Sequence, residues 1–176
     1  ELDILNNIAK SKNANQGIML RLSPSVDAHT HAHTTTGILD VKFGFSIETG
    51  ESSTAIKQAL DSSHLILQGI HFHLGSPIFE LEPYSNAIDT VFDYLKPFLH
   101  QGLDLKKFSP GGGFAIGYLQ RQLPPSIAGY ADVITSMLKT KCDDLGIDYP
   151  ELIIEPGRSI VGRAGVAIYT VGVTKV

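Results

Sequence analysis

Residues 65–72 read Leu65-Ile66-Leu67-Gln68-Gly69-Ile70-His71-Phe72, a short and mostly apolar run that is typical of a buried strand. Apolar residues spaced three and four apart follow between Tyr84 and Leu99, and this spacing predicts an amphipathic helix. A second short run, Leu105 to Phe108, predicts another strand. Two strands joined by a helix of this length run parallel, because the helix carries the chain back to its starting edge. The stretch therefore predicts a βαβ unit.

The same alternation continues on both sides of this unit. Runs at 17–22 and 151–154 predict two more buried strands. Apolar periodicity predicts three more helices, near residues 5–9, 55–60 and 127–145. Ser52 or Ser53 is available as the N-cap of the second of these. Repeated alternation of helix and strand predicts an α/β fold with a parallel sheet.

Length and composition restrict the class of protein. A chain of 176 residues with 43% hydrophobic content can bury one sizeable core, which favours a single domain. A formal net charge of −4, without any run of Lys or Arg, argues against a nucleic-acid or anionic-membrane surface. No segment is long and apolar enough to span a bilayer. The sequence therefore predicts a soluble globular protein that binds neither nucleic acid nor a membrane.

Cys142 is the only cysteine, which excludes an intrachain disulfide and a cysteine-based zinc site within these residues. A single reduced thiol fits a cytoplasmic protein. Cys142 falls on the helix predicted near 127–145, in surroundings that do not lower a thiol pKa. We expect it to pack inside the protein.

The two ends of the chain suggest a larger parent. Position 1 is Glu and not Met, and residues 167–173 alternate between apolar and other side chains like a strand in mid-course. A natural domain more often finishes with a cap or a polar tail. We therefore expect the chain to be a fragment.

Chemically active residues follow four of the predicted strands. In α/β barrels and open α/β sheets, the loops after the strands build the site. The sequence therefore predicts one site at the C-terminal edge of the sheet, formed by Arg21, the pair His71 and His73, Gly111-Gly112-Gly113, and Glu155-Pro156-Gly157-Arg158.

The glycine triplet has two interpretations. Three glycines let backbone amides converge without Cβ atoms in the way, so the loop can hold a phosphate. A flexible turn is the alternative. The triplet matches neither the Walker pattern nor the dinucleotide fingerprint.

Glu155 and Arg158 also have two interpretations. They can form an ion pair on a surface turn, which stabilises little. However, Glu155 ends an apolar run, where a carboxylate needs a positive partner such as a protonated heteroaromatic nitrogen. The forked donors of Arg158 suit a phosphate or a carboxylate.

His71 and His73 share one face of their strand and are followed by Ser76. The pair can bind a metal, as in barrel hydrolases. Alternatively, one histidine stacks on a flat ring while Ser76 reaches a phosphate, or the histidines are buried and satisfied by the backbone. Three further histidines, His29, His31 and His33, lie in a polar stretch that is typical of a solvated loop, with a metal site as the alternative.

Taken in order, these motifs resemble the diaminopimelate decarboxylase branch of the alanine-racemase-like decarboxylases, which depend on pyridoxal 5'-phosphate. The resemblance covers nearly the whole chain and implies a partial (β/α)8 TIM barrel. Its motifs are Arg21-Leu-Ser-Pro-Ser-Val-Asp-Ala-His-Thr-His31, Thr36-Gly37, Lys42-Phe43-Gly44, Gly69-Ile-His-Phe-His-Leu-Gly-Ser76, Gly111-Gly112-Gly113-Phe114 and Glu155-Pro-Gly-Arg-Ser-Ile-Val161.

The resemblance implies residue roles. His73 would stack on the pyridoxal ring as a catalytic and cofactor-binding residue. Ser76 and Gly111, Gly112 and Gly113 would hold the phosphate. Arg21 would lie near the hydroxyl side of the ring, and no metal is implied.

The resemblance gives the turn at 155–158 two functions. Glu155 would pair with the pyridine nitrogen as a second catalytic residue. Arg158 would lie near the phosphate and a substrate carboxylate, and Pro156 and Gly157 complete the cofactor-binding turn.

The resemblance also implies which parts lie elsewhere. Residues 1–176 would form the central and C-terminal part of the barrel. The lysine that carries the cofactor would lie upstream, and a catalytic cysteine and a β-domain would lie downstream. We expect the fragment alone to be inactive.

The implied activity of the parent is decarboxylation of meso-2,6-diaminopimelate to L-lysine, by a cytoplasmic homodimer. Ornithine, arginine and carboxynorspermidine decarboxylases of the same fold are alternatives. A metal-dependent barrel hydrolase and a cofactor-carrying protein without catalysis are alternatives of other classes.

Overall fold

The computed structural model describes residues 1–26, 43–118 and 123–174. His29, His31 and His33, with Thr36, Gly37, Lys42 and Lys175, lie outside the described residues. The elements in chain order are α1 (Leu2–Ser11), β1 (Gln16–Ser23), β2 (Phe45–Ser46), α2 (Glu51–Leu60), β3 (Leu65–His71), α3 (Glu82–Leu99), β4 (Lys107–Ser109), α4 (Ile127–Leu145), β5 (Glu151–Leu152) and α5 (Gly157–Val161).

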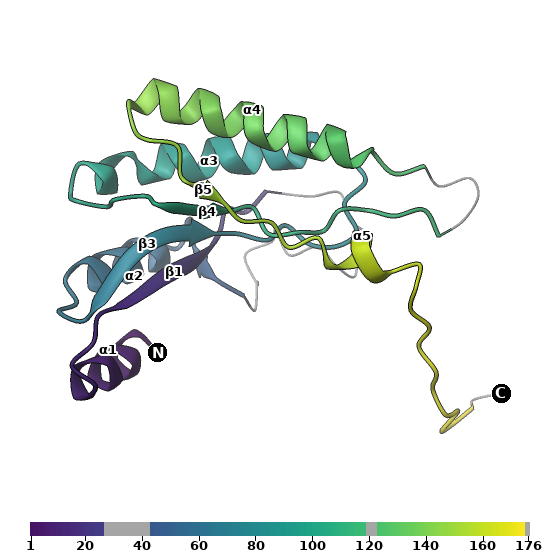
Figure 1. The fold of residues 1–176 in the computed structure, drawn as a ribbon, viewed down its shortest axis with the longest axis horizontal. Coiled ribbons are helices and arrows are strands. Elements are labelled where there is room, and N and C mark those ends of the chain that lie inside the picture. Colours follow the sequence, from purple (N-terminus) through teal and green to yellow (C-terminus); the bar gives the residue numbers. More distant parts are fainter. Residues whose placement is uncertain (27–42, 119–122, 175–176) are drawn as a thin grey trace.

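The strands form one parallel sheet in the order β2-β1-β3-β4-β5 (Figure 1). The predicted α/β class and the predicted βαβ unit, here β3-α3-β4, are therefore confirmed. Two elements were not predicted, β2 and α5, because each is too short to show a periodic pattern. The strand predicted at 105–108 begins at Lys107 instead.

One face of the sheet carries the core. Alternate strand residues pack with α2, α3 and α4 into a single apolar cluster, whose members include Leu20, Leu22, Ile70, Phe72, Phe108, Ile56, Phe92 and Ile134. The side chains between them, such as Met19, Arg21 and His71, are only half-buried. Because successive side chains of a strand point to opposite faces, polar chemistry is placed on the uncovered face.

The helix α4 begins and ends as its sequence predicts. Ser126 is the N-cap and accepts a hydrogen bond from the Gly129 amide at 3.0 Å. Gly146 follows the helix in the left-handed conformation, with φ of +62°.

The N-cap predicted for α2 is wrong. Gly50 occupies that position, with φ of +79°, and Ser52 lies inside the first turn. The Ser52 side chain is fully buried and its hydroxyl lies 2.6 Å from that of Tyr94 on α3. A hydrogen bond to a neighbouring helix therefore uses the hydroxyl that the sequence suggested for capping.

The strand predicted at 167–173 is also wrong. This segment is irregular and extends away from the sheet toward the C-terminus (Figure 1). Its side chains are exposed, with Ile168 at 90% and Tyr169 at 86%. Alternating residues form a strand only where a neighbouring strand can take their hydrogen bonds, and no described strand lies beside this segment.

Cys142 packs inside the protein as predicted. Its side chain is fully buried on α4, and this burial, with the charge of Asp143 as the smaller cause, raises the pKa of the thiol to about 11. We expect Cys142 of the folded full-length protein to resist iodoacetamide at neutral pH, because only the thiolate reacts. Mass spectrometry of the Cys142 peptide measures this. Alkylation should become complete in denaturant, and equal labelling in both states would contradict the burial.

Candidate functional site

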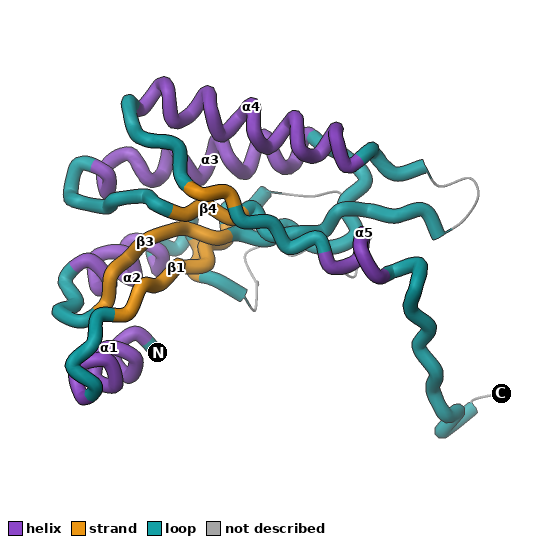
Figure 2. Tube along the Cα trace, in the orientation of Figure 1, coloured by secondary structure: helices purple, strands orange, loops and turns teal. Residues whose placement is uncertain are grey.

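The C-terminal ends of four strands bring the predicted site residues side by side. Arg21 on β1 lies opposite His71 on β3, and His71 lies opposite Ser109 on β4. Beyond the strands, Gly112 forms an isolated parallel bridge with Glu155. Figure 2 shows the loops after β3, β4 and β5 leaving the sheet in the same direction. Strand register therefore brings together the loops that carry the site residues.

The glycine triplet is packed against its neighbours. A Cβ atom on Gly112 would fall inside contact distance of the Glu155 carbonyl oxygen. A Cβ on Gly111 would lie 2.6 Å from the Phe72 carbonyl oxygen, and a Cβ on Gly113 would collide with the carbonyl of Gly75. The flexible-turn interpretation therefore fails, because these glycines allow backbones to approach closely.

Two amides of the triplet already have partners within the protein. The Gly111 amide donates to the Ser109 hydroxyl at 3.2 Å, and the Gly112 amide donates to Nδ1 of His73 at 3.1 Å. On its other side, the Gly112 carbonyl accepts a hydrogen bond from the Tyr84 hydroxyl at 2.7 Å. Gly112 is therefore held on both sides, through its N–H and through its carbonyl.

Glu155 pairs with His71 in this structure. Its Oε1 lies 3.0 Å from Nε2 of His71, and its side chain is 53% exposed against 17% for the histidine. Burial lowers the pKa of His71 and outweighs the opposing effect of Glu155. Since a neutral imidazole can still donate from Nε2, the contact is a hydrogen bond at neutral pH.

Arg21 adds positive charge beside these histidines. Burial lowers the pKa of His73, and the charge of Arg21 lowers it further. Burial likewise lowers the pKa of Arg21, while Glu155 opposes that effect. The Arg21 guanidinium also lies 5.0 Å from the centre of the Phe43 ring. The two histidines are therefore neutral near pH 7, between a fixed cation and a carboxylate.

Arg158 and Ser76 meet although 82 residues separate them in sequence. Nε of Arg158 donates to the Ser76 hydroxyl at 3.1 Å, and Nη1 donates to the Tyr118 hydroxyl at 2.9 Å. A guanidinium and two hydroxyl groups thus gather at one place. Such a group of donors can bind a phosphate or carboxylate oxygen.

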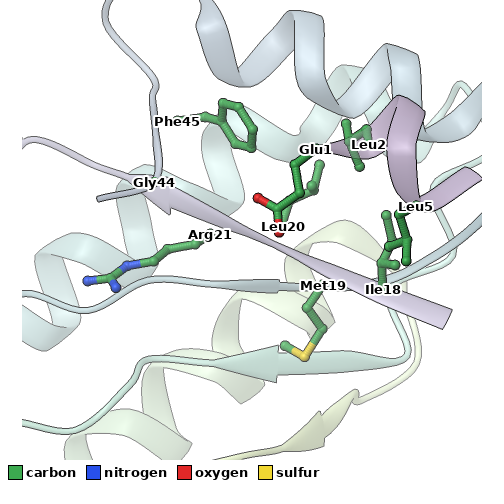
Figure 3. Close-up of a pocket in the computed structure, with 9 residues that line it drawn as sticks. All are labelled: Glu1, Leu2, Leu5, Ile18, Met19, Leu20, Arg21, Gly44 and Phe45. Carbon is green, nitrogen blue, oxygen red and sulfur yellow. The ribbon is translucent and has the colours of Figure 1, made fainter. Parts of the chain in front are cut away.

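A cavity of about 380 Å³ lies apart from these donors. It opens between α1, β1 and β2 and is lined mainly by aliphatic side chains (Figure 3). Figure 3 shows the side chain of Arg21 pointing away from Leu2 and Leu5 of α1. Arg21 is among the residues that line this cavity, but Ser76 and Arg158 are not, so the group of anion-binding donors lies outside it.

Sequence reasoning missed the tyrosines of the site. Tyr84 and Tyr130 are fully buried, and their rings pack edge to face with centres 5.7 Å apart. The Tyr130 hydroxyl donates to the Ile78 carbonyl and accepts from the Ala115 amide. In sequence, Tyr84 looks like any member of an apolar helix stripe. The available signal was its hydroxyl, because a buried phenol needs a partner.

The described residues bring together no group of three or more His, Cys, Asp or Glu side chains that could hold a metal ion. His71 bonds to Glu155, and His73 accepts from a backbone amide. The metal interpretation of this histidine pair therefore gains no support from the part of the chain that the structure describes.

Comparison with protein families identifies the chain. The model for the pyridoxal binding domain of pyridoxal-dependent decarboxylases matches residues 1–162. The chain belongs to the pyridoxal-dependent decarboxylase family. Pyridoxal 5'-phosphate, the predicted cofactor, is therefore confirmed.

Curated members of the pyridoxal-dependent decarboxylases align with nearly the whole chain. The diaminopimelate decarboxylase of Halalkalibacterium halodurans is 39% identical over 178 residues, which cover 99% of this chain and 40% of that protein. The Bacillus subtilis diaminopimelate decarboxylase is 38% identical over 176 residues, with 99% and 40% covered. The chain thus spans about two fifths of the length of these relatives.

Solved structures of the family share the fold. Diaminopimelate decarboxylase from M. jannaschii gives a TM-score of 0.79 at 31% identity, covering 90% of this chain and 36% of that chain. The Helicobacter pylori enzyme, complexed with L-lysine, gives 0.75 at 31% identity, covering 90% and 38%. The predicted fold, part of a (β/α)8 barrel of the alanine-racemase-like type, is confirmed.

Among the described residues, no helix is long and apolar enough to cross a membrane.

The residues present fit pyridoxal phosphate. The group carries a phosphate, which suits the donors of Ser76 and Arg158, and a ring nitrogen, which suits a carboxylate. Glu155 offers a half-exposed carboxylate on the open face. Gly112 packs against the backbone of Glu155, and Gly113 packs against that of Gly75, the residue before Ser76.

Proposed function

We propose that the full-length protein is a pyridoxal-phosphate-dependent decarboxylase that converts meso-2,6-diaminopimelate to L-lysine and carbon dioxide. The supporting observation is the joint arrangement of Ser76 with Arg158 and of Glu155 at adjacent strand ends, within a chain of this family. Ser76 and Arg158 offer donors for the phosphate of bound pyridoxal phosphate, and Glu155 offers a carboxylate for its ring nitrogen.

Glu155 is the proposed partner of the pyridine nitrogen. A carboxylate there would hold a proton on that nitrogen, because the two charges stabilise each other. With this proton in place, bound pyridoxal phosphate supplies an electron sink for the pair released as carbon dioxide leaves. Glu155 must exchange its bond to His71 for this role, and its exposure leaves it free to do so.

The remaining site residues bind and orient. Arg158 and Ser76 hold the phosphate, with Gly113 at the end of the triplet, and the turn formed by Pro156 and Gly157 carries Arg158 into place. Gly111 and Gly112 complete the wall of the phosphate site. In a second proposed role, Arg158 also contacts a substrate carboxylate.

Two other residues act on the ring itself. His73 lies against the ring, held from behind by the Gly112 amide, and Arg21 lies on the hydroxyl side of the ring. Arg21 belongs to β1 and His73 follows the end of β3, and these two strands are in direct register near their C-terminal ends.

The proposal extends to the parent protein. Residues 1–176 form the central and C-terminal part of the barrel, and the lysine and catalytic cysteine belong to other parts of the protein. The fragment alone is then inactive. The parent is proposed to be a cytoplasmic homodimer that takes small amino-acid substrates.

The choice of substrate rests on relatives. The curated proteins at 38–39% identity are diaminopimelate decarboxylases. A lysine decarboxylase and an arginine decarboxylase also share the fold, at 22% and 25% identity. Diaminopimelate is therefore favoured over other basic amino acids.

An assay of the purified full-length protein tests the substrate. With pyridoxal phosphate present, we expect carbon dioxide and L-lysine from meso-diaminopimelate, and little product from ornithine or arginine. Chromatography of the amine products measures this. Putrescine or agmatine as the main product would contradict the proposal, and so would hydrolysis that depends on an added metal.

Arg158→Gln is expected to weaken binding of pyridoxal phosphate to the full-length apoprotein by about tenfold to a hundredfold, because charge-assisted hydrogen bonds are the strong ones. Equilibrium dialysis measures the change. Arg163→Gln is the control, since the Arg163 guanidinium donates to the Gly117 carbonyl at 3.2 Å and is not among the predicted site residues. Equal losses in both variants would show that general positive charge, and not the Arg158 position, binds the phosphate.

A further inference from the structure

Tyr84 lies behind the glycine triplet and has no place in the function proposed above. It is on α3, fully buried, with its ring against those of Phe114 and Tyr130. Its hydroxyl donates to the Gly112 carbonyl at 2.7 Å. Burial raises the pKa of Tyr84, so the hydroxyl keeps its proton and acts as a donor at any physiological pH.

On the other side of the Gly112 Cα, the preceding peptide group contacts His73. Its amide lies 3.1 Å from Nδ1 of His73. A peptide N–H can only donate, so Nδ1 must accept and carries no proton. The remaining proton of a neutral imidazole then lies on Nε2. The backbone thus selects one of the two tautomers.

The charged groups around His73 come from three elements. They are Arg21 on β1, His71 on β3 and Glu155 after β5. Burial and Arg21 favour the neutral form of His73, while Glu155 favours the charged form. The hydrogen bond from the Gly112 N–H also favours the neutral form, because a protonated Nδ1 could not accept it.

We propose that Tyr84 is a positioning residue that acts through the backbone of Gly112 to hold His73 as the neutral Nε2–H tautomer. The bond from the Tyr84 hydroxyl to the Gly112 carbonyl restricts rotation about the Gly112 Cα, and this keeps the Gly112 N–H directed at Nδ1 of His73. The functional consequence rests on the proposed function. A neutral imidazole can lie against a pyridoxal ring whose nitrogen Glu155 keeps protonated, whereas a positively charged imidazolium would repel that ring.

Nitrogen NMR of the full-length protein, labelled with ¹⁵N in histidine, tests the tautomer directly. The His73 signals are those that disappear in His73→Asn. We expect the wild-type Nδ1 shift to be that of an unprotonated nitrogen, with and without pyridoxal phosphate. A protonated Nδ1 in the wild type at neutral pH would overturn the proposal, whether or not any variant folds.

Tyr84→Phe tests the part played by the hydroxyl. It keeps the ring and removes the bond to Gly112. We expect His73 to titrate at higher pH than in the wild type, the Nδ1–H tautomer to appear, and pyridoxal phosphate to bind about threefold to tenfold more weakly.

Tyr94→Phe is the matched control. It removes a hydroxyl from the same helix, and that hydroxyl bonds to Ser52 and not to the site. The His73 signals should be unchanged in it. If both variants leave His73 as in the wild type, Tyr84 has only a packing role and the proposal fails. The NMR measurement uses no substrate, so a wrong choice of substrate would leave it unaffected.

Discussion

Glu155→Gln in the full-length protein is expected to lower kcat by on the order of a hundredfold to a thousandfold, with a small change in the binding of pyridoxal phosphate. Glutamine keeps the size and hydrogen-bonding ability of the side chain but cannot balance a positive charge on the ring nitrogen. Steady-state release of carbon dioxide measures kcat, and equilibrium dialysis measures binding.

Glu151→Gln is the matched control for this effect. Glu151 is an exposed carboxylate at the start of β5, the short strand that precedes Glu155. We expect it to retain activity close to that of the wild type. If the two variants lose activity equally, the effect is one of total charge, and the role proposed for Glu155 is wrong.

Gly112→Ala is expected to lower the free energy of unfolding by about 3 kcal/mol, at the upper end of the usual cost of overpacking. The added Cβ collides with the backbone carbonyl of Glu155, which cannot rotate away as a side chain can. The two loops must separate, so the site should lose pyridoxal phosphate affinity together with stability. Urea unfolding of the full-length protein measures the first effect, and equilibrium dialysis the second.

Gly129→Ala controls for the general effect of replacing a glycine. A Cβ there meets Leu81 at 3.4 Å, an ordinary contact, and the residue lies on α4, where alanine is favoured. Its stability should be unchanged or slightly higher. A Gly112→Ala protein as stable as Gly129→Ala would show that the loops after β4 and β5 have room to separate.

The elements that the sequence predicts well are those with long patterns. The stripe from Tyr84 to Leu99 extends over several turns, so its period is unambiguous, and the helix is found at Glu82–Leu99. The spacing of His71 and His73 places both on one face by alternation alone. Both conclusions depend on local geometry, which sequence carries directly.

What could not be predicted depends on contacts between distant segments. The capping role expected of Ser52 was lost to Tyr94, 42 residues away. The strand expected at 167–173 has no neighbouring strand among the described residues, and the hydrogen bonds of a sheet require two adjacent segments. Glu155 meets His71 across 84 residues, and no local pattern indicates which of several polar groups becomes the partner.

Because one face of the sheet packs against the core and the other carries the site, successive residues of a strand serve stability and function in turn. At 19–22 on β1 and at 70–73 after the bulge in β3, one residue of each neighbouring pair faces the apolar layer and the next faces the ligand side. Substitutions at Leu20, Leu22, Ile70 and Phe72 should therefore reduce the yield of folded protein. Substitutions at Arg21 and His73 should leave yield intact while removing catalysis. A saturation library scored once for abundance and once for growth without lysine would show the two phenotypes alternating residue by residue.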